Sequence, residues 1–287
     1  MSVPFTDCGS QIGAGSGTIL PMTKRTIASA ALFLFLLGCA SSSTHPSFRL
    51  RVMTYNLHHG EGIDGKFDLE RIARLISDNK ADLVALQEVD FQTKRTGRRD
   101  MAGEIGALAG MTNVFGANID FEGGQYGNAI LSRFPIVSAT NHHLPQISPN
   151  EQRGLLQATV RLPIGSLTFC SLHLDHRRPE ADRLAGVARI HEILADVPTP
   201  QIVAGDFNAR PDSETYRAMA PEKIYRDAWK VVGVGDGHTI PSPNPNARID
   251  YVWFRGGRLM PTAGRVIVSQ ASDHLPLLIE FTEVDAK

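Results

Sequence analysis

The sequence QIVAGDFN at residues 201–208 begins as an apolar run and ends in the polar side chains of Asp206 and Asn208. A short apolar run of this kind is typical of a buried strand. Side chains that perform chemistry usually lie where strands pass into loops. The same junction between an apolar strand and polar residues recurs along the chain.

Polar groups of the same kind stand at the ends of other predicted strands. They are Asn56, Glu88, His173, Asp250, Asp273 and His274. Taken singly, a strand-end Asp is more often a turn or capping residue than a ligand. Together, acidic, amide and imidazole groups at so many strand ends predict one convergent site for a hard metal ion, because Mg²⁺ prefers carboxylate and amide oxygens.

Hydrophobic periodicity predicts a chain rich in strands. Strands are predicted at 49–56, 82–88, 128–132, 155–162, 167–174, 201–205, 250–254 and 277–281. Helices are predicted at 68–79, 101–109, 180–194 and 213–219, the first of them with Asp68 as its N-cap. Many strands with few intervening helices favour mixed sheets over a regular βαβ barrel.

The N-terminal stretch has the pattern of an export signal. Lys24 and Arg25 precede a short apolar run that ends in Leu37, Gly38 and Cys39. The run is shorter than the roughly 20 residues that span a bilayer, so a cleaved signal at 22–38 is favoured over a transmembrane helix. Residues 1–21 precede the expected start of this signal and are interpreted as an untranslated or disordered extension.

The end of the predicted signal resembles a bacterial lipobox, whose cysteine becomes the acylated first residue of the mature protein. The resemblance implies that Cys39 carries a lipid anchor and holds the protein on a membrane of the bacterial cell envelope. The alternative is plain cleavage near Ala40 and release as a soluble secreted or periplasmic protein. Residues 39–47 are rich in Ser and Thr and are predicted to form a flexible tether before one domain at 48–287.

Charge and cysteine content narrow the function. The chain has 29 basic and 30 acidic side chains and a formal net charge of −1. General polyanion binders are basic, so this balance argues against non-specific nucleic-acid binding without excluding a nuclease. Cys170 is the only cysteine after Cys39, which rules out a disulfide within the domain, and its apolar strand favours a core residue over a nucleophile.

Short motifs follow one another along the predicted domain. They are MTYNL at 53–57, LQEVD at 86–90, GNAILS at 127–132, SLHL at 171–174, GDFN at 205–208, RIDY at 248–251 and SDHLP at 272–276. In this order they resemble the endonuclease/exonuclease/phosphatase superfamily, which includes pancreatic deoxyribonuclease, exonuclease III, inositol polyphosphate 5-phosphatases and neutral sphingomyelinases. The resemblance spans residues 50–282. It implies a four-layer α/β/β/α sandwich of two mixed β-sheets packed face to face, with the site at one edge.

The resemblance also implies a metal site. Glu88 would be the principal ligand, and Asn56 and Asp273 would complete the site directly or through metal-bound waters. Mg²⁺ is the expected ion and Mn²⁺ the alternative, and Mg²⁺ commonly keeps several waters beside few protein carboxylates. The ion would polarise a phosphoryl oxygen in an in-line displacement.

Catalytic roles follow from the same resemblance. Asp206 would orient or deprotonate the attacking water, and Asn208 would donate to that water or to a phosphoryl oxygen. His274 would pair with Asp250, and His173 would donate to a non-bridging phosphoryl oxygen. Whether Asp206 or the His274–Asp250 pair takes the proton is left open.

Basic residues near the motifs predict a rim that binds substrate. Arg95 and Arg98 follow one motif and Arg177 follows another, and Arg can bind a phosphate through two parallel hydrogen bonds. A solvated loop is an equal alternative for these residues. Asn128 is also expected to contact substrate, and the Gly- and Pro-rich stretch at 233–245 is expected to be a mobile loop.

Several functions remain open at this point. The first is a Mg²⁺-dependent phosphodiesterase that acts on nucleic acid or on a phospholipid or sphingolipid head group. The second is a phosphomonoesterase of inositol-phosphate type. The third, from a different class, is a non-catalytic binding module of the envelope. We expect an enzyme that acts as a monomer.

Overall fold

The computed structural model describes residues 13–15, 17–18, 47–198, 200–221 and 224–284. The predicted signal at 22–38, Cys39 and almost all of the predicted tether lie outside the described residues. Residues 44–287 form one unit, separate from residues 1–43, and this unit is described below. Among the described residues, no helix is both long and apolar enough to cross a membrane.

Two six-stranded sheets carry the fold, in the orders β11-β12-β1-β2-β4-β3 and β5-β6-β7-β8-β10-β9. The first contains β11 (Leu259–Val266), β12 (Leu277–Glu283), β1 (Arg49–Asn56), β2 (Leu83–Phe91), β4 (Gly124–Ser132) and β3 (Thr112–Phe121). The second contains β5 (Ile136–His143), β6 (Gly154–Leu162), β7 (Gly165–His173), β8 (Gln201–Asp206), β10 (Asp250–Arg255) and β9 (Arg226–Asp227).

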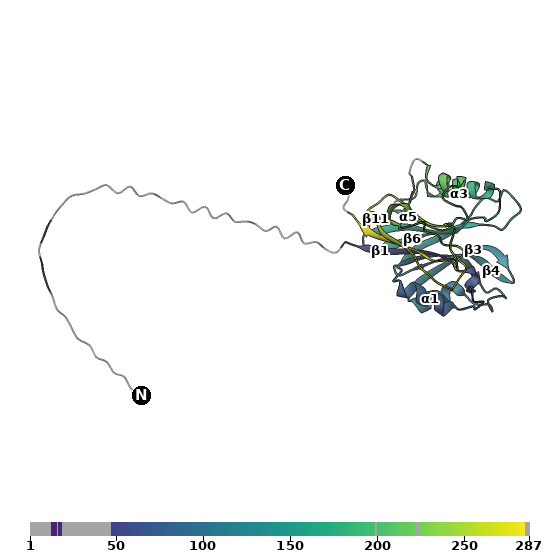
Figure 1. Cartoon of the computed structure of the whole chain (residues 1–287), viewed down its shortest axis with the longest axis horizontal. Coiled ribbons are helices and arrows are strands. Elements are labelled where there is room, and N and C mark those ends of the chain that lie inside the picture. Colours follow the sequence, from purple (N-terminus) through teal and green to yellow (C-terminus); the bar gives the residue numbers. More distant parts are fainter. Residues whose placement is uncertain (1–12, 16, 19–46, 199, 222–223, 285–287) are drawn as a thin grey trace, which may run out of the picture. The chain divides into compact units, whose positions relative to one another are not determined.

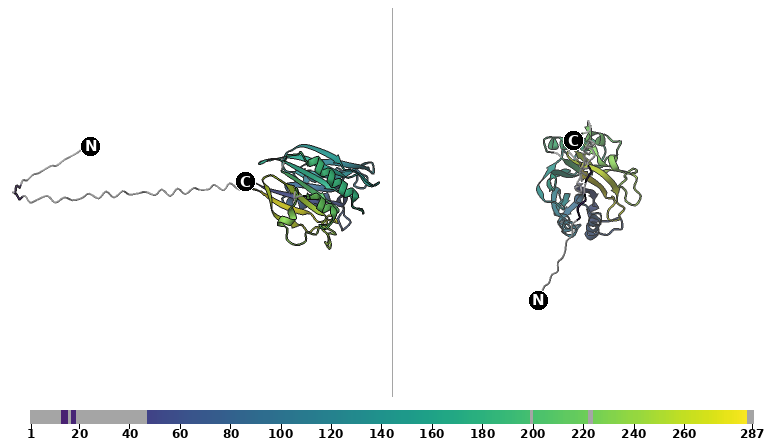
Figure 2. Two further views of the ribbon diagram at one scale, coloured as in Figure 1. Left: turned by 90° about the horizontal axis from the view of Figure 1, so that it is seen from above. Right: turned by 90° about the vertical axis from the view of Figure 1, so that its left-hand side faces the viewer.

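Helices cover the outer faces of both sheets, with α1 on one side and α3 on the other (Figures 1 and 2). The helices are α1 (Leu69–Asp78), α2 (Met101–Ala109), α3 (Ala181–Leu194), α4 (Glu214–Met219) and α5 (Ala228–Val232), with a 3-10 turn at His58–Gly60. Asp68 caps α1, as predicted, by accepting a hydrogen bond from the Arg71 amide at 2.7 Å.

Alternation of side chains along the strands creates three apolar layers. In β1, Leu50 and Val52 pack into the core between the two sheets. Met53 and Tyr55, on the opposite face of the same strand, pack beneath α1 and α2. The second sheet has its own outer core under α3 and α4. The predicted four-layer sandwich is confirmed.

Strand directions bring the polar strand ends to one edge. β1 runs parallel to β2, and β7 runs parallel to β8 with His173 opposite Asp206. Parallel neighbours end at the same edge of a sheet, so Asn56 lies near the end of β2. β10 is antiparallel to β8 and begins at this edge, with Asp250 opposite Asp206.

Buried polar contacts join the two sheets near this edge. The Gln87 amide nitrogen in β2 donates to the Ser171 hydroxyl in β7 at 3.3 Å, and that hydroxyl donates back to the Leu86 carbonyl at 3.1 Å. The Thr54 hydroxyl donates to Gln87 Oε1 at 3.2 Å. These bonds fix how the strand ends of one sheet face those of the other.

The strands that hydrophobic periodicity did not predict are edge or near-edge strands. They are β3, β5, β9 and β11. β5 has mostly exposed side chains, and β11 contains Pro261 next to a register shift. Edge strands lack the continuous burial that produces an apolar run, and proline is tolerated there.

The segment at 233–245, expected to be a mobile loop, is held at its C-terminal part by backbone hydrogen bonds. The Leu275 amide donates to the Thr239 carbonyl at 2.7 Å, and the Ser242 amide donates to the Asp273 carbonyl at 2.7 Å. Thr239 is completely buried. The expectation of mobility is corrected for residues 239–242, because their backbone is bonded to the SDHLP motif.

Gly205 is predicted to be required by packing. A Cβ at this position would lie 2.1 Å from the Leu172 carbonyl oxygen. Because that oxygen belongs to the neighbouring strand, Gly205→Ala should lower the free energy of unfolding by about 1–3 kcal/mol, measured by urea denaturation.

Gly186→Ala is the matched control for this substitution. Its Cβ would meet Leu174 Cδ2 at 3.4 Å, an ordinary contact, inside helix α3. Alanine is favoured over glycine in a helix interior, so this variant should be at least as stable as the wild type. Equal stability of the two alanine variants would contradict the packing argument.

Candidate active site

A bulge in β2 turns Glu88 out of the regular strand pattern. The pairing of β2 with β4 shifts between Leu86 and Val89, and Glu88 has a φ of +57°. This left-handed conformation is costly for a residue with a side chain, and bulges often re-aim a side chain beside an active site. Gln87 and Val89 are buried, whereas Glu88 is half-buried. Its carboxylate therefore reaches the edge of the sheet.

Asn56 connects this carboxylate to the other sheet. Its Nδ2 donates to Glu88 Oε1 at 3.0 Å and to Asp206 Oδ2 at 3.1 Å. Its Oδ1 accepts from the His58 amide at 3.0 Å, and its backbone carbonyl accepts from the Ser272 hydroxyl at 2.7 Å. The ends of β1, β2 and β8 and the SDHLP motif are thus brought together around one amide.

Asp206 is the buried carboxylate at the centre of the cluster. Its Oδ2 lies 3.6 Å from His173 Nε2 and 3.7 Å from His274 Nε2. Its Oδ1 accepts a hydrogen bond from the backbone amide of Asn208 at 2.8 Å. Burial, followed by repulsion from Asp250, raises the pKa of Asp206 to about 7, against the attraction of His274.

The predicted His274–Asp250 contact is present. His274 Nδ1 lies 2.9 Å from Asp250 Oδ2. The Thr239 hydroxyl donates to the same oxygen at 2.5 Å. Burial alone would lower the pKa of His274, but the charge of Asp250, its hydrogen bond and the charge of Asp206 outweigh burial and raise it to about 10. These carboxylates therefore favour the imidazolium form of His274.

His173 has the opposite protonation state. The side-chain nitrogen Nδ2 of Asn208 lies 3.0 Å from His173 Nε2 and donates to the Leu174 carbonyl at 3.0 Å. An Nε2 that accepts this bond assigns the ring proton to Nδ1, which is buried and has no partner among the described residues. Burial, followed by Arg153 and His274, holds the pKa of His173 well below its usual value. The ring is a neutral imidazole with an unused Nδ1–H.

Both amide hydrogens of Asn208 are engaged in these two contacts. Its predicted donation to water or phosphate would require one of them to break. Asn208 has a φ of +48°, which asparagine tolerates better than most residues. In this structure Asn208 orients His173, and its direct role toward substrate stays a prediction.

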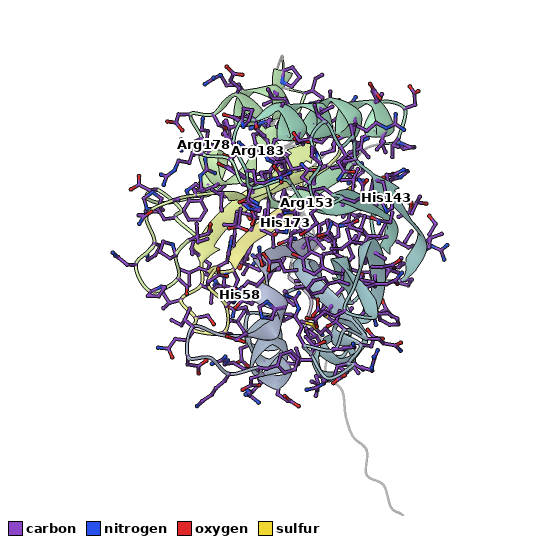
Figure 3. The ribbon with its side chains drawn as sticks, turned by 90° about the vertical axis from the view of Figure 1, so that its right-hand side faces the viewer. His58, His143, Arg153, His173, Arg178 and Arg183 are labelled. Carbon is purple, nitrogen blue, oxygen red and sulfur yellow. The ribbon has the colours of Figure 1, made fainter. Side chains whose placement is uncertain are left out.

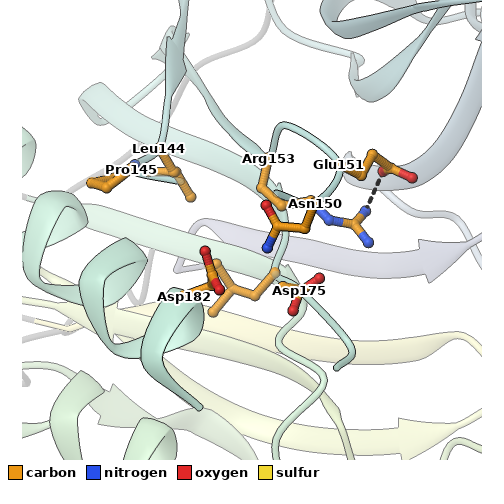
Figure 4. A pocket seen from close by; sticks show the side chains of 8 residues that line it. Leu144, Pro145, Asn150, Glu151, Arg153, Asp175 and Asp182 are labelled. Carbon is orange, nitrogen blue, oxygen red and sulfur yellow. Dashed lines mark ion pairs between the residues drawn. The ribbon is translucent and has the colours of Figure 1, made fainter. Parts of the chain in front are cut away.

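Arg153 and Glu151 were not predicted as site residues. Arg153 lies beside His173 on the face of the molecule shown in Figure 3. Its Nη1 lies 2.8 Å from Glu151 Oε1, and the ion pair is drawn in Figure 4. Its Nε is buried and has no partner among the described residues. The sequence did contain a signal for these residues, because Glu151 and Arg153 form a pair of opposite charges directly before an apolar strand. The sequence search looked for polar residues at strand ends, and this pair stands at a strand start.

The residues predicted to bind substrate all contact other parts of the protein. Arg95 donates twice to Asp90, at 2.6 and 2.8 Å, and covers the Phe121 ring. Arg98 donates to the carbonyls of Gln92 and Gly123. Arg177 donates to the carboxylate of Asp175 and to the Pro149 carbonyl. The side chain of Asn128 donates to the Gly154 carbonyl. Arg95 is thus occupied by a buried carboxylate, and substrate binding by these residues stays a prediction.

Two sets of side chains are candidates to hold a metal ion, and only the first is shown to have converging ligand atoms among the described residues. Asp206, Asp250 and His274 have ligand atoms within 4.8 Å of one another. The second set is centred on Glu88, whose second carboxylate oxygen has no hydrogen-bond partner among the described residues, with Asn56 and Asp273 nearby in the network. The first set already contains the positive charge of His274, so the oxygen donors around Glu88 suit a hard divalent cation better.

Comparison with known proteins is consistent with this arrangement. The family model described as "Endonuclease/Exonuclease/phosphatase family" matches residues 53–274. The uncharacterized protein YbhP of Escherichia coli is 28% identical over 251 residues, which cover 82% of this chain and 96% of YbhP.

Solved structures share the same fold. An endonuclease/exonuclease/phosphatase from Beutenbergia cavernae is 25% identical, with a TM-score of 0.67 over 83% of this chain and 72% of that one. A mannosyl-6-phosphatase from Bacteroides thetaiotaomicron is 18% identical, with a TM-score of 0.68 over 81% of this chain and 99% of that one. The family model covers most of the domain, including the motif residues from Asn56 to His274. The chain therefore belongs to the endonuclease/exonuclease/phosphatase family.

Proposed function

We propose that this protein is a divalent-metal-dependent phosphodiesterase that uses Mg²⁺, with Mn²⁺ as a substitute. The observation that carries the proposal is the position of Asp206. This buried carboxylate lies 3.6 Å and 3.7 Å from two imidazoles whose pKa values are shifted in opposite directions, and it is bonded through Asn56 to the half-buried Glu88. Such a set of perturbed titratable groups at one sheet edge is typical of a catalytic site.

Glu88, Asn56 and Asp273 are the residues that would hold the ion. When bound, a divalent ion neutralises charge on the phosphoryl group and polarises one of its oxygens. The side chains around it would supply the remaining functions of a phosphoester hydrolase, namely a proton acceptor and hydrogen-bond donors.

Asp206 is the group that we assign as the proton acceptor. Its pKa of about 7 keeps part of the population ionised near neutral pH while making the carboxylate basic enough to take a proton from water. The carboxylates of Asp250 and Asp206 raise the pKa of His274, which favours its protonated form and a role as a hydrogen-bond donor to a developing negative charge. Asp250 and Thr239 hold its ring in place.

His173 would contribute a neutral donor. Its unpaired Nδ1–H gains a partner only if a ligand or water provides an acceptor. Arg153 adds a positive charge close to the same ring. A phosphoryl group has acceptor oxygens for both, which supports a phosphoester as substrate.

We further propose that the protein is exported, lipidated at Cys39, held in the bacterial cell envelope and active as a monomer. The support comes from the signal-like sequence alone. The substrate would then be a phosphodiester that is accessible from a membrane surface, in nucleic acid or in a lipid head group.

The diesterase assignment predicts a clear substrate preference. With Mg²⁺ present, bis-p-nitrophenyl phosphate should be hydrolysed and p-nitrophenyl phosphate should be hydrolysed at least about tenfold more slowly in kcat/KM. Excess EDTA should abolish release of p-nitrophenol, which is measured by absorbance. Preference for the monoester would favour a phosphomonoesterase instead, and full activity in EDTA would exclude the metal-dependent mechanism.

Glu88→Gln is predicted to remove metal binding and activity together. Loss of the ligand charge should lower kcat/KM about 100-fold or more. Mg²⁺ should also raise the Tm of the wild type, by about 2–4 °C for each kcal/mol of binding, but not the Tm of the variant. Glu70→Gln, an exposed change on α1, is the control and should keep both properties. A Mg²⁺-dependent Tm shift that survives in Glu88→Gln would place the ion elsewhere.

The low pKa of His173 predicts a loss of stability in acid. In the unfolded chain, His173 takes up a proton near the ordinary pKa of 6.5. In the folded protein the protonation occurs at a much lower pH. The charged and titratable groups that face the ring are Arg153, His176, His274 and Asp206. The stability that follows from keeping His173 neutral is fully present above pH 6.5. Below pH 6.5 the free energy of unfolding decreases by up to about 1.4 kcal/mol per pH unit.

The measurement is urea denaturation between about pH 5 and pH 7, the range in which this histidine titrates in the unfolded chain. His173→Gln should show a smaller decrease of the free energy of unfolding on acidification than the wild type. His143→Gln, an exposed histidine in β5, should show the wild-type slope. Identical slopes in all three proteins would mean that His173 is not held neutral.

A further inference from the structure

A groove of about 1020 Å³ opens beside Asn208. Its walls come from the segment after β7, the segment after β8 and the segment before β10, and Arg178 on its wall lies on the same face as His173 (Figure 3). Pockets that hold small organic ligands have volumes of about 300–1,000 Å³. The groove is therefore much larger than a phosphoryl group requires.

The groove walls carry charges of both signs. The cations Arg178 and Arg210 are exposed, and the anions Asp212 and Glu214 are exposed on the same groove. Among the described residues, Arg178, Asp212 and Glu214 have no side-chain hydrogen bond or ion pair, and Arg210 has a weak contact of 3.3 Å to the Asn246 carbonyl. Both donors and acceptors are thus available to a ligand.

Apolar side chains lie between these charged groups. Ile240, Ala247 and Ile249 line the groove, and Ile240 and Ala247 are joined by an antiparallel bridge. Among the described residues that line the groove, only His176 has an aromatic ring, and none is Phe, Tyr or Trp. Stacking on aromatic rings is a main source of affinity for nucleobases, so a lining with one imidazole and no larger aromatic ring offers a nucleobase little stacking surface.

We propose that this groove binds the alcohol portion of the substrate and that this portion is a hydroxyl-rich polyol or sugar. The proposal rests on the phosphodiesterase function proposed above. Carboxylates accept hydrogen bonds from hydroxyl groups, arginines donate to hydroxyl and ring oxygens, and the apolar residues pack against C–H groups. A further phosphate, as in an extended nucleic acid, could pair with the arginines but would leave the carboxylates of Asp212 and Glu214 without hydrogen-bond donors.

Three matched 4-nitrophenyl phosphodiesters test this assignment, with methanol, the 6-hydroxyl of glucose or the 5′-hydroxyl of thymidine as the second alcohol. The glucose ester should have a kcat/KM about tenfold or more above that of the methyl ester, mainly through a lower KM. The thymidine ester should show no comparable gain. A thymidine ester that is the best of the three would overturn the proposal.

Substitution of the groove carboxylates gives an independent measure. The double variant Asp212→Asn, Glu214→Gln should lower the glucose-to-methyl ratio of kcat/KM about tenfold, because hydrogen bonds to charged groups are lost. Asp78→Asn, on α1, is the control and should leave both the ratio and the rates unchanged. An unchanged ratio in the double variant would also overturn the assignment.

The phosphodiesterase function and the groove assignment can be tested separately with these esters. If the methyl ester is not hydrolysed, the proposed phosphodiesterase function is wrong, and the groove assignment that rests on it is wrong as well. If the methyl ester is hydrolysed but the glucose ester has no advantage, the enzyme function stands and only the groove assignment is wrong.

Discussion

The need to bury the carboxylate of Asp206 constrains the architecture around it. A buried carboxylate is costly unless hydrogen bonds and nearby charge compensate for its lost hydration. Here the compensation comes from Asn56 in the first sheet and from the Asn208 backbone amide and His274 around the second. The two sheets must therefore meet at one register, and the Gln87–Ser171 contact maintains that register from within the core.

The same constraint explains why Glu88 and Asp206 differ although both end apolar strands. Asp206 continues its strand, stays buried and has a raised pKa. Glu88 leaves its strand through a bulge with a left-handed backbone and reaches solvent. Burial suits a proton acceptor, whereas a half-exposed carboxylate with an unpaired oxygen suits a cation. Backbone geometry thus separates two acidic residues into two roles.

Sequence reasoning predicted the interior of the molecule well because interior strands combine apolar runs with polar ends. The capped helix at Asp68, the sandwich and the His274–Asp250 contact all follow from such local patterns or from the motif order. The bulge at Glu88 could not be predicted, since the letters LQEVD do not reveal a positive φ. Thr239 was missed because it joins the site through Asp250, eleven residues away. Arg153 was missed because its charge pair with Glu151 stands at the start of a strand, where no site residue was sought.

The direction of β1 has a consequence for how the domain faces its surroundings. This strand starts at Arg49 and reaches the site only at Asn56, so the domain is entered from the edge opposite the catalytic cluster, about 25 Å away at the usual rise of a strand. Any attachment through the residues before β1 therefore acts on the edge of the sandwich where β1 begins. A lipid anchor at Cys39, as proposed, would therefore join the domain at the end of β1 that is farthest from Asn56.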